Sequence, residues 1–222
     1  MRRLFQLVAA ALLITVAPAV RAQLHLHRDK PAAEDLSWMW QYTAPAPTGN
    51  SKALLADARF KQLLAAHLHA PQTFWGTNKT LPEAIVEFLG QPRSVVAEQN
   101  RYFIATGCVA QFCPERGMLW IDIASPRPLF VFAATNWIAE DKPTDQAGAT
   151  YTLWVFTSRA LDPAHLPQAL TRSIAPWAQE PLADKTVEQI ANVILVDPDG
   201  QPHQLQPTDV GITQPTEQKA NS

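Results

Sequence analysis

The spacing of hydrophobic residues predicts two helices in the first half of the chain. Over residues 57–68, large apolar side chains recur at the three- and four-residue intervals that place them on one helix face: Phe60, Leu63, Leu64 and Leu68. Over residues 80–89, Thr80 and Glu83 match a capping box at the start of a helix. Gly90 supplies the stop for this second helix.

After residue 92 the pattern changes to short runs rich in β-branched and aromatic residues, which are typical of strands. These runs cover residues 93–98, 101–106, 117–123, 129–135, 151–157 and 193–196. Gln99 and Asn100 fit a two-residue hairpin turn between the first two runs. Residues 166–177 return to helical spacing, and Pro176 is expected to kink or end that helix.

This order of elements predicts an α+β fold, with an antiparallel sheet of about five strands and helices packed on it. Short links between consecutive strands favour antiparallel pairing, and helices grouped apart from the strands favour a layered fold. We expect one α+β domain over residues 51–206. Residues 23–50 are read as an irregular, aromatic-rich arm, and residues 207–222 as a polar, flexible tail. The aromatic part of the arm is expected to pack on the domain.

Residues 1–22 have the pattern of a secretory signal peptide. Arg2 and Arg3 precede an apolar run, and small residues at Val20 and Ala22 fit a cleavage site near Ala22. The run is interrupted by Pro18 and is shorter than a membrane-spanning helix requires. No later stretch is long and apolar enough to span a membrane. The sequence therefore predicts a periplasmic or secreted protein.

Composition and charge exclude several classes of protein. The chain has 222 residues, of which 47% are hydrophobic and 17% are charged, which excludes a disordered protein. The leader contains three arginines and no acid, so 15 basic residues face 20 acidic ones in the remainder. A mildly acidic chain with scattered charges has no electrostatic footprint for nucleic acid.

Cys108 and Cys113 are the only two cysteines, and they flank a four-residue loop. In an exported protein, such a close, even-numbered pair predicts a disulfide. Redox catalysis more often uses two intervening residues, and a zinc site needs more ligands than two thiolates. A disulfide-closed hairpin loop is a rigid projection, and rigidity lowers the entropic cost of entering a partner's cleft. A purely structural bridge is the alternative interpretation.

Other motifs give little support for a cofactor, a metal or catalysis. His25 with His27 and His67 with His69 form two H-x-H pairs, but side chains two residues apart on a helix diverge. The Asp-Pro-Asp-Gly sequence at residues 197–200 resembles part of a calcium loop without its closing Glu, and it fits a turn better. No nucleophile, zinc-protease or phosphate-loop motif is present. We expect no cofactor and no enzyme activity.

The strongest signal lies around the cysteine loop. RYFIATGCVAQFC at residues 101–113, GMLWID at 117–122 and LFVF at 129–132 resemble the core of the inhibitor of vertebrate lysozyme (Ivy) family. The resemblance covers roughly residues 73–177. It implies a periplasmic protein with an antiparallel sheet, helices packed on it, and a C-x4-C disulfide loop that enters a lysozyme cleft. It also implies a homodimer.

The loop residues depart from the family pattern. The family has Lys, Pro, His and Asp between its cysteines, whereas this chain has Val109, Ala110, Gln111 and Phe112. A glutamine amide can hydrogen-bond to carboxyl groups but cannot become cationic as histidine does. Loss of the lysine removes attraction toward an acidic cleft, and a phenylalanine suits a more apolar pocket.

The resulting hypothesis is an exported Ivy-like binding protein. Its loop would insert into a lysozyme or another peptidoglycan-degrading enzyme, with residues 109–112 as the contacts. The alternative is an exported scaffold or immunity-type protein of the same fold, which would bind another partner through the aromatic arm from Trp38 to Tyr42. An envelope enzyme with no recognisable site is a third reading.

Overall fold

The computed structural model describes residues 34–43, 49–70, 79–124, 127–135, 150–181 and 189–213. The expected signal peptide, the first H-x-H pair and the last part of the predicted tail lie outside these residues. Among the described helices, none is both long and apolar enough to cross a membrane.

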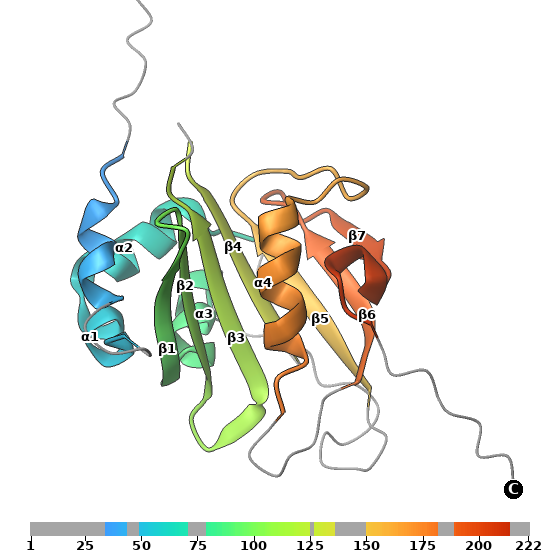
Figure 1. Cartoon of the computed structure of the whole chain (residues 1–222), viewed down its shortest axis with the longest axis horizontal. Helices are drawn as coiled ribbons and strands as arrows, with labels where there is room; N and C mark the ends of the chain where they lie inside the picture. The colour runs from blue at the N-terminus through green and yellow to red at the C-terminus, as the bar shows by residue number, and fades with distance from the viewer. Residues whose placement is uncertain are drawn as a thin grey trace, which may run out of the picture. The chain divides into compact units, whose positions relative to one another are not determined.

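Seven strands in the described part of the chain form one sheet, in which each strand lies next to its sequence neighbour (Figure 1). They are β1 (Gln91–Glu98), β2 (Tyr102–Val109), β3 (Phe112–Asp122), β4 (Leu129–Thr135), β5 (Thr150–Thr157), β6 (Gln189–Val196) and β7 (Pro202–Leu205). All pairs are antiparallel except β5 with β6, which is parallel. The prediction of helices with a mainly antiparallel sheet is confirmed.

The predicted number of strands, about five, is too low. Strand β7 has only four residues and buries one of them, Leu205, so it gives almost no hydrophobic pattern. The parallel pairing of β5 with β6 was also not predicted. A parallel neighbour requires a crossover connection, and the helix α4 (Gln168–Ala178) lies in it.

Helices cover both faces of the sheet. On one face lie the 3-10 helix η1 (Ser37–Tyr42), α1 (Ser51–Ala56), α2 (Ala58–His67) and α3 (Leu81–Phe88), and on the other lie α4 and the 3-10 helix η3 (Pro207–Val210). Figure 1 shows α4 in front of the sheet and α3 behind it. The sheet is therefore the middle of three layers.

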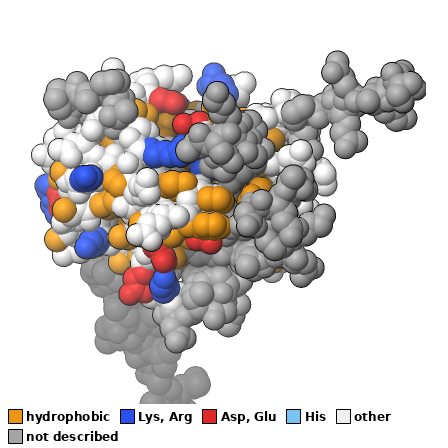
Figure 2. Space-filling view, turned by 90° about the horizontal axis from the view of Figure 1, so that it is seen from below, with side chains coloured by type: hydrophobic (Ala, Val, Ile, Leu, Met, Phe, Trp, Pro, Cys, Tyr) orange, Lys and Arg blue, Asp and Glu red, His pale blue; other side chains and the backbone are white. Residues whose placement is uncertain are grey.

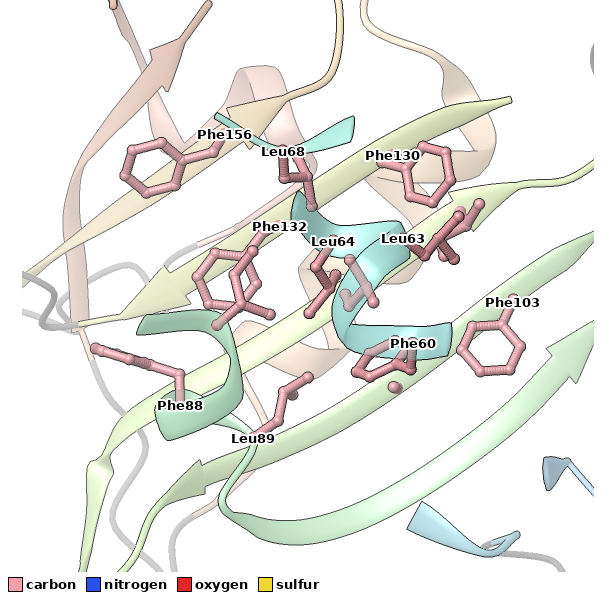
Figure 3. Packing of buried hydrophobic residues seen from close by; sticks show 14 of the residues in the cluster. Phe60, Leu63, Leu64, Leu68, Phe88, Leu89, Phe103, Phe130, Phe132 and Phe156 are labelled. Atoms are coloured by element: carbon pink, nitrogen blue, oxygen red, sulfur yellow. The ribbon is translucent and has the colours of Figure 1, made fainter. Parts of the chain in front are cut away.

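Alternation along the central strands fills two separate cores. On β4, Phe130 and Phe132 face α2 and α3, whereas Val131 faces the side of α4. Figure 3 shows the first core, in which leucines of α2 and Phe88 of α3 point toward phenylalanine side chains on the strands of the sheet. Because both faces are buried, the strands read as nearly continuous apolar runs.

The capping box predicted from the sequence is confirmed, and α2 also has a capping residue. Asp57 accepts a hydrogen bond from the backbone N–H of Arg59 at the start of α2. Thr80 and Glu83 form the reciprocal bonds of a capping box at the start of α3. Pro176 does not end α4 at once, because the helix continues to Ala178.

The aromatic part of the N-terminal arm packs on the first core. Met39 is fully buried, and the Trp40 ring lies 6.3 Å from the ring of Phe103 on β2. The guanidinium of Arg59 lies over the Trp38 ring at 4.4 Å from its centroid. Trp38 and Trp40 are therefore half-buried, and the density of aromatic residues correctly predicted their packing.

The arm is also held by Asp57. Its carboxylate accepts hydrogen bonds from the Tyr42 hydroxyl at 2.5 Å and from the Arg59 guanidinium at 2.7 Å. These donors, with Arg59 the strongest influence and Tyr42 the next, hold the pKa of Asp57 well below its usual range. A carboxyl whose pKa is lowered in the fold stabilises the protein at pH values above its unfolded pKa.

We predict that Asp57→Asn lowers the melting temperature at pH 7, because the amide can still cap α2 but carries no charge for Arg59. The difference from the wild type should shrink as the pH falls below about 4, where the unfolded carboxyl begins to bind a proton. Melting curves between pH 2 and 7 measure this. A difference that stays constant over that range would contradict the assigned cause.

Residues 207–213 belong to the folded domain rather than to the predicted tail. Val210 and Ile212 are buried in the second core, against the side of the sheet that α4 covers. Gly211, in the left-handed conformation at φ 81°, ends η3. Two apolar residues in a polar stretch gave too little pattern to indicate this docking.

Candidate functional site

The hairpin formed by β2 and β3 ends in a two-residue turn at Ala110 and Gln111, at the lower end of the sheet in Figure 1. Cys108 and Cys113 form the predicted disulfide across it. Gln111 has φ 69°, in the left-handed region that non-glycine residues rarely occupy. The turn is therefore tight, and it is shorter than the four-residue loop expected from the sequence.

A bulge lies directly behind this turn. Val109 pairs with Phe112, but the preceding residue of β2, Cys108, pairs with Arg116. Residues 113–115 of β3 therefore have no partner on β2, and the disulfide spans the place where the register shifts. Bulges of this kind occur next to functional sites, where they redirect side chains.

The bulge is fixed by a buried hydroxyl on the neighbouring strand. Thr135, the last residue of β4, donates a hydrogen bond to the Pro114 carbonyl at 3.0 Å. The same hydroxyl accepts one from the backbone N–H of Arg116 at 3.3 Å. The unpaired backbone of the bulge thus finds a partner in the sheet, which holds it in one conformation.

Arg116 anchors the hairpin to the other layer. The residue is 1% exposed. The guanidinium donates hydrogen bonds to three carbonyls at the C-terminal end of α4, those of Trp177, Ala178 and Glu180, and the shortest of these bonds is 2.8 Å long. The last carbonyls of a helix lack partners within the helix and carry its negative dipole end, so a buried cation is favoured there. The base of the hairpin is therefore tied to α4.

Helix α3 meets the hairpin at two paired glycines. A side chain at Gly107 would approach the backbone of Leu89 to 2.8 Å, and one at Gly117 would approach Phe88 to 2.9 Å. These two glycines pair across β2 and β3. They let the end of α3 lie directly on the strands, so α3 supports the hairpin from the face opposite to α4.

Phe112 is the exposed aromatic group of this hairpin. It is 38% exposed, and no other large hydrophobic side chain among the described residues is as exposed. Its cross-strand partner Val109 packs against the core on the α3 side, so Phe112 stands on the same face. Figure 2 looks onto this end of the molecule, where hydrophobic side chains gather among charged ones.

The four predicted contact residues are brought together, with different exposures. Ala110, Gln111 and Phe112 are exposed, whereas Val109 is half-buried in the core contact just described. Sequence reasoning missed the groups that hold these residues in place, namely Thr135 and Arg116. It also missed Glu115, the remaining polar group of the bulge.

Glu115 is a half-buried carboxyl that forms no hydrogen bond or ion pair with any described residue. Burial raises its pKa, and repulsion by Glu87 on α3 adds to the effect, while Lys79 opposes it. The Lys79 ammonium lies 2.6 Å from the carboxylate of Glu87, and so it is already engaged. Glu115 is thus partly desolvated, and it has no direct ion pair to offset this.

We predict that Glu115→Gln stabilises the protein at pH 7, because it removes a charge that the fold disfavours. A carboxyl whose pKa is raised on folding destabilises the fold when ionised, and this penalty disappears as the pH falls to the unfolded pKa, near 4.3. The wild type should therefore match the variant in melting temperature at about pH 4 and fall below it at pH 7.

Glu180→Gln serves as the control for this comparison, since Glu180 is an exposed acid paired with Arg93 at 3.4 Å. Its replacement should change stability by less than about 0.5 kcal/mol at either pH. Equal melting temperatures for Glu115→Gln and the wild type at pH 7 would show that the carboxyl carries no penalty.

The other candidate sites of the sequence gain no support as ligand sites. The imidazole of His67 contacts Glu34 at 2.6 Å and stacks on Phe130, so it holds the arm rather than pairing with His69. The described residues contain no group of three or more potential metal ligands. Residues 197–200 form the turn between β6 and β7, and Asp197 pairs with His203 at 2.9 Å.

A groove between α2 and α3 has a volume of about 590 Å³ and was not indicated by any motif. It is lined mainly by apolar side chains, including Leu68 and Leu81, with Lys61 and His69 as polar members. Glu83, which also lines it, is used in the capping box of α3. None of its lining residues belongs to the hairpin end.

The comparisons give no independent identification of this site. No protein-family model, curated protein or solved structure matches the chain.

Proposed function

We propose that the protein is an exported binding protein whose β2–β3 hairpin end inserts into a cleft of a peptidoglycan-degrading enzyme, such as a lysozyme. The observation that carries this proposal is the exposure of Phe112 at the tip of a hairpin that is otherwise firmly held. Aromatic residues held in rigid surroundings are typical binding anchors, and this ring keeps part of its surface accessible.

Rigidity of the hairpin supports this function. The disulfide closes the tip, Thr135 fixes the bulge, and Arg116 ties the base to α4. A binding element that is already ordered loses little conformational entropy when it docks, so more of its contact energy appears as affinity. The proposed activity is binding and not catalysis.

The tip also suits a cleft that combines polar and apolar surface. The exposed amide of Gln111 can donate to and accept from groups in a sugar-binding cleft, including carboxylates. Phe112 beside it offers an aromatic face to an apolar wall. The resemblance to the Ivy family supports this choice of partner, and with it a periplasmic or secreted location and a homodimeric state.

The alternative through the aromatic arm has less support. Trp38 and Trp40 are half-buried against the first core, and Arg59 covers the Trp38 ring. These contacts cover part of the surface of each ring. We therefore place the binding surface at the hairpin end.

The test is capture of a panel of lysozymes and of wall hydrolases from envelope extract by the immobilised protein. The wild type is compared with a Cys108→Ser, Cys113→Ser double variant, because a reducing agent would also attack disulfides in the partners. We expect capture of a muramidase that the double variant weakens at least about tenfold. Capture that is equal in both proteins would place the binding surface elsewhere, and no capture would refute the function.

A further inference from the structure

Two arginines of this protein share a specific arrangement, in which the guanidinium pairs with a carboxylate and covers an aromatic ring. Arg59 contacts Asp57 at 2.7 Å and lies 4.4 Å from the Trp38 ring centroid. Arg101 donates to both carboxylate oxygens of Asp122, at 2.8 and 2.7 Å, and lies 5.1 Å from the Tyr102 ring. A planar guanidinium satisfies both partners at once.

The hairpin end contains the same two partners without the arginine. Phe112 stands on the α3 side of the hairpin, as its pairing with Val109 shows. Glu115 interacts electrostatically with Glu87 and Lys79, which belong to α3 and the residues just before it, so its carboxyl is on that side too. An aromatic ring and a carboxylate, three residues apart, thus lie on one face.

None of the neighbouring described cations pairs directly with Glu115. Arg116, the nearest arginine in sequence, points to the opposite face and donates to carbonyls of α4. Arg93 pairs with Glu180, and Lys79 pairs with Glu87. Among the described residues, Glu115 therefore has no direct ion-pair partner, and Lys79 acts on its carboxylate without forming an ion pair with it.

We infer that Phe112 and Glu115 form a receptor for one arginine side chain of the partner protein. The inference rests on the proposed binding function and specifies the partner chemistry: the guanidinium pairs with the Glu115 carboxylate and stacks on the Phe112 ring. Arginine is favoured over lysine because its flat group makes both contacts together, whereas an ammonium is a compact and strongly hydrated charge. The partner surface at this point is basic.

The fold provides a reason to keep a carboxyl without a direct ion pair at this position. Glu115 stands in the bulge, where the chain departs from regular pairing and Thr135 holds the backbone. A partially desolvated carboxylate has already lost part of its water shell, so an incoming guanidinium displaces less water than it would at a fully solvated acid. The same feature disfavours the free fold and favours the complex.

The test uses a probe that does not depend on finding the natural partner. Acetyl-glycyl-arginyl-glycine amide is titrated into the isotope-labelled, disulfide-bonded protein at constant ionic strength, and NMR follows the signals of Phe112 and Glu115. The citrulline tripeptide, which has the same shape without the charge, is the matched ligand control. We expect saturable shifts at these two residues with a dissociation constant on the order of 10 mM.

The citrulline tripeptide should bind about 5- to 30-fold more weakly than the arginine tripeptide. Glu115→Gln and Phe112→Ala should each reduce arginine binding, whereas Glu180→Gln should leave it unchanged. Equal shifts with both tripeptides, shifts spread over all surface acids, or no shift at Phe112 and Glu115 up to about 50 mM would each overturn the inference.

This experiment separates the inference from the proposed function. If the arginine tripeptide binds at Phe112 and Glu115 but no hydrolase is captured, the receptor stands and the choice of partner is wrong. If a muramidase is captured through the hairpin but the tripeptide fails, the binding function stands and the arginine receptor is refuted.

Discussion

Replacing Arg116 with methionine is expected to lower the free energy of unfolding by about 3–5 kcal/mol. Methionine fills a similar volume but cannot donate, so the carbonyls of Trp177, Ala178 and Glu180 lose their buried partner. Unpaired buried carbonyls keep their full desolvation penalty, and the end of α4 also loses a favourable charge. Urea unfolding at pH 7 measures the difference.

Arg93→Met is the matched control for this prediction. Arg93 also approaches the end of α4, through Glu180 at 3.4 Å, but it is partly exposed. Its replacement should cost less than about 1 kcal/mol, because exposed ion pairs contribute little. A loss for Arg116→Met no larger than for Arg93→Met would show that the buried guanidinium does not anchor α4.

Arg116→Lys distinguishes the geometry of the anchor from its charge. A lysine ammonium keeps the positive charge but cannot reach three carbonyls in the plane of a guanidinium. We expect a loss of stability between those of the wild type and Arg116→Met. Full recovery by lysine would mean that charge alone matters at this helix end.

Local patterns predicted the parts of the fold that depend on neighbouring residues. The capping box of α3 joins residues three apart, and the apolar repeat of α2 repeats within each turn, so both are visible in a short window. The disulfide was predicted for the same reason, since Cys108 and Cys113 are five residues apart. Such features need no knowledge of distant contacts.

Features that depend on distant residues were not predictable from one sequence. Arg116 meets its partners more than 60 positions later, and those partners are backbone carbonyls that no side-chain pattern reveals. Thr135 supports the bulge from the next strand, 21 residues beyond Pro114. Charged and hydroxyl residues within strands usually suggest exposure, and here both are buried.

The sequence predicted where the candidate site lies but not its backbone structure. The sequence placed a rigid loop between the two cysteines, whereas the structure has a tight turn followed by a three-residue bulge. The bulge changes the chemistry of the surface, because it contains Glu115 on the same face as Phe112. The four residues between the cysteines carry no charge. An interpretation based on them alone therefore leaves out the carboxyl of Glu115.

The aromatic tip and the carboxyl behind it both destabilise the free fold, whereas both are expected to favour binding. Phe112 leaves apolar surface in water, and Glu115 loses water without gaining a partner. Violations of local folding rules are expected at functional sites. Their combination on one rigid hairpin is the physical argument for a binding role.

Replacing Phe112 with alanine is expected to weaken binding of the captured hydrolase about 30-fold, equivalent to about 2 kcal/mol. The side chain is the exposed aromatic group of the tip. In the proposed complex, its removal takes away the contact area that would fill the partner's pocket. Because it is exposed in the free protein, the melting temperature should change by no more than about 2 °C. Calorimetric titration with the purified hydrolase measures the affinity.

Three further variants make this result specific. Phe112→Tyr keeps the ring and should retain affinity within about threefold, whereas Gln111→Ala should weaken binding by removing the amide contacts. Trp38→Ala tests the arm: its ring is half-buried and covered by Arg59, so it should lower stability more than affinity. If Trp38→Ala weakens binding more than Phe112→Ala does, the arm and not the hairpin carries the interaction. A loss of affinity larger than the unfolded fraction of the variant can explain would mean that Trp38 contacts the partner.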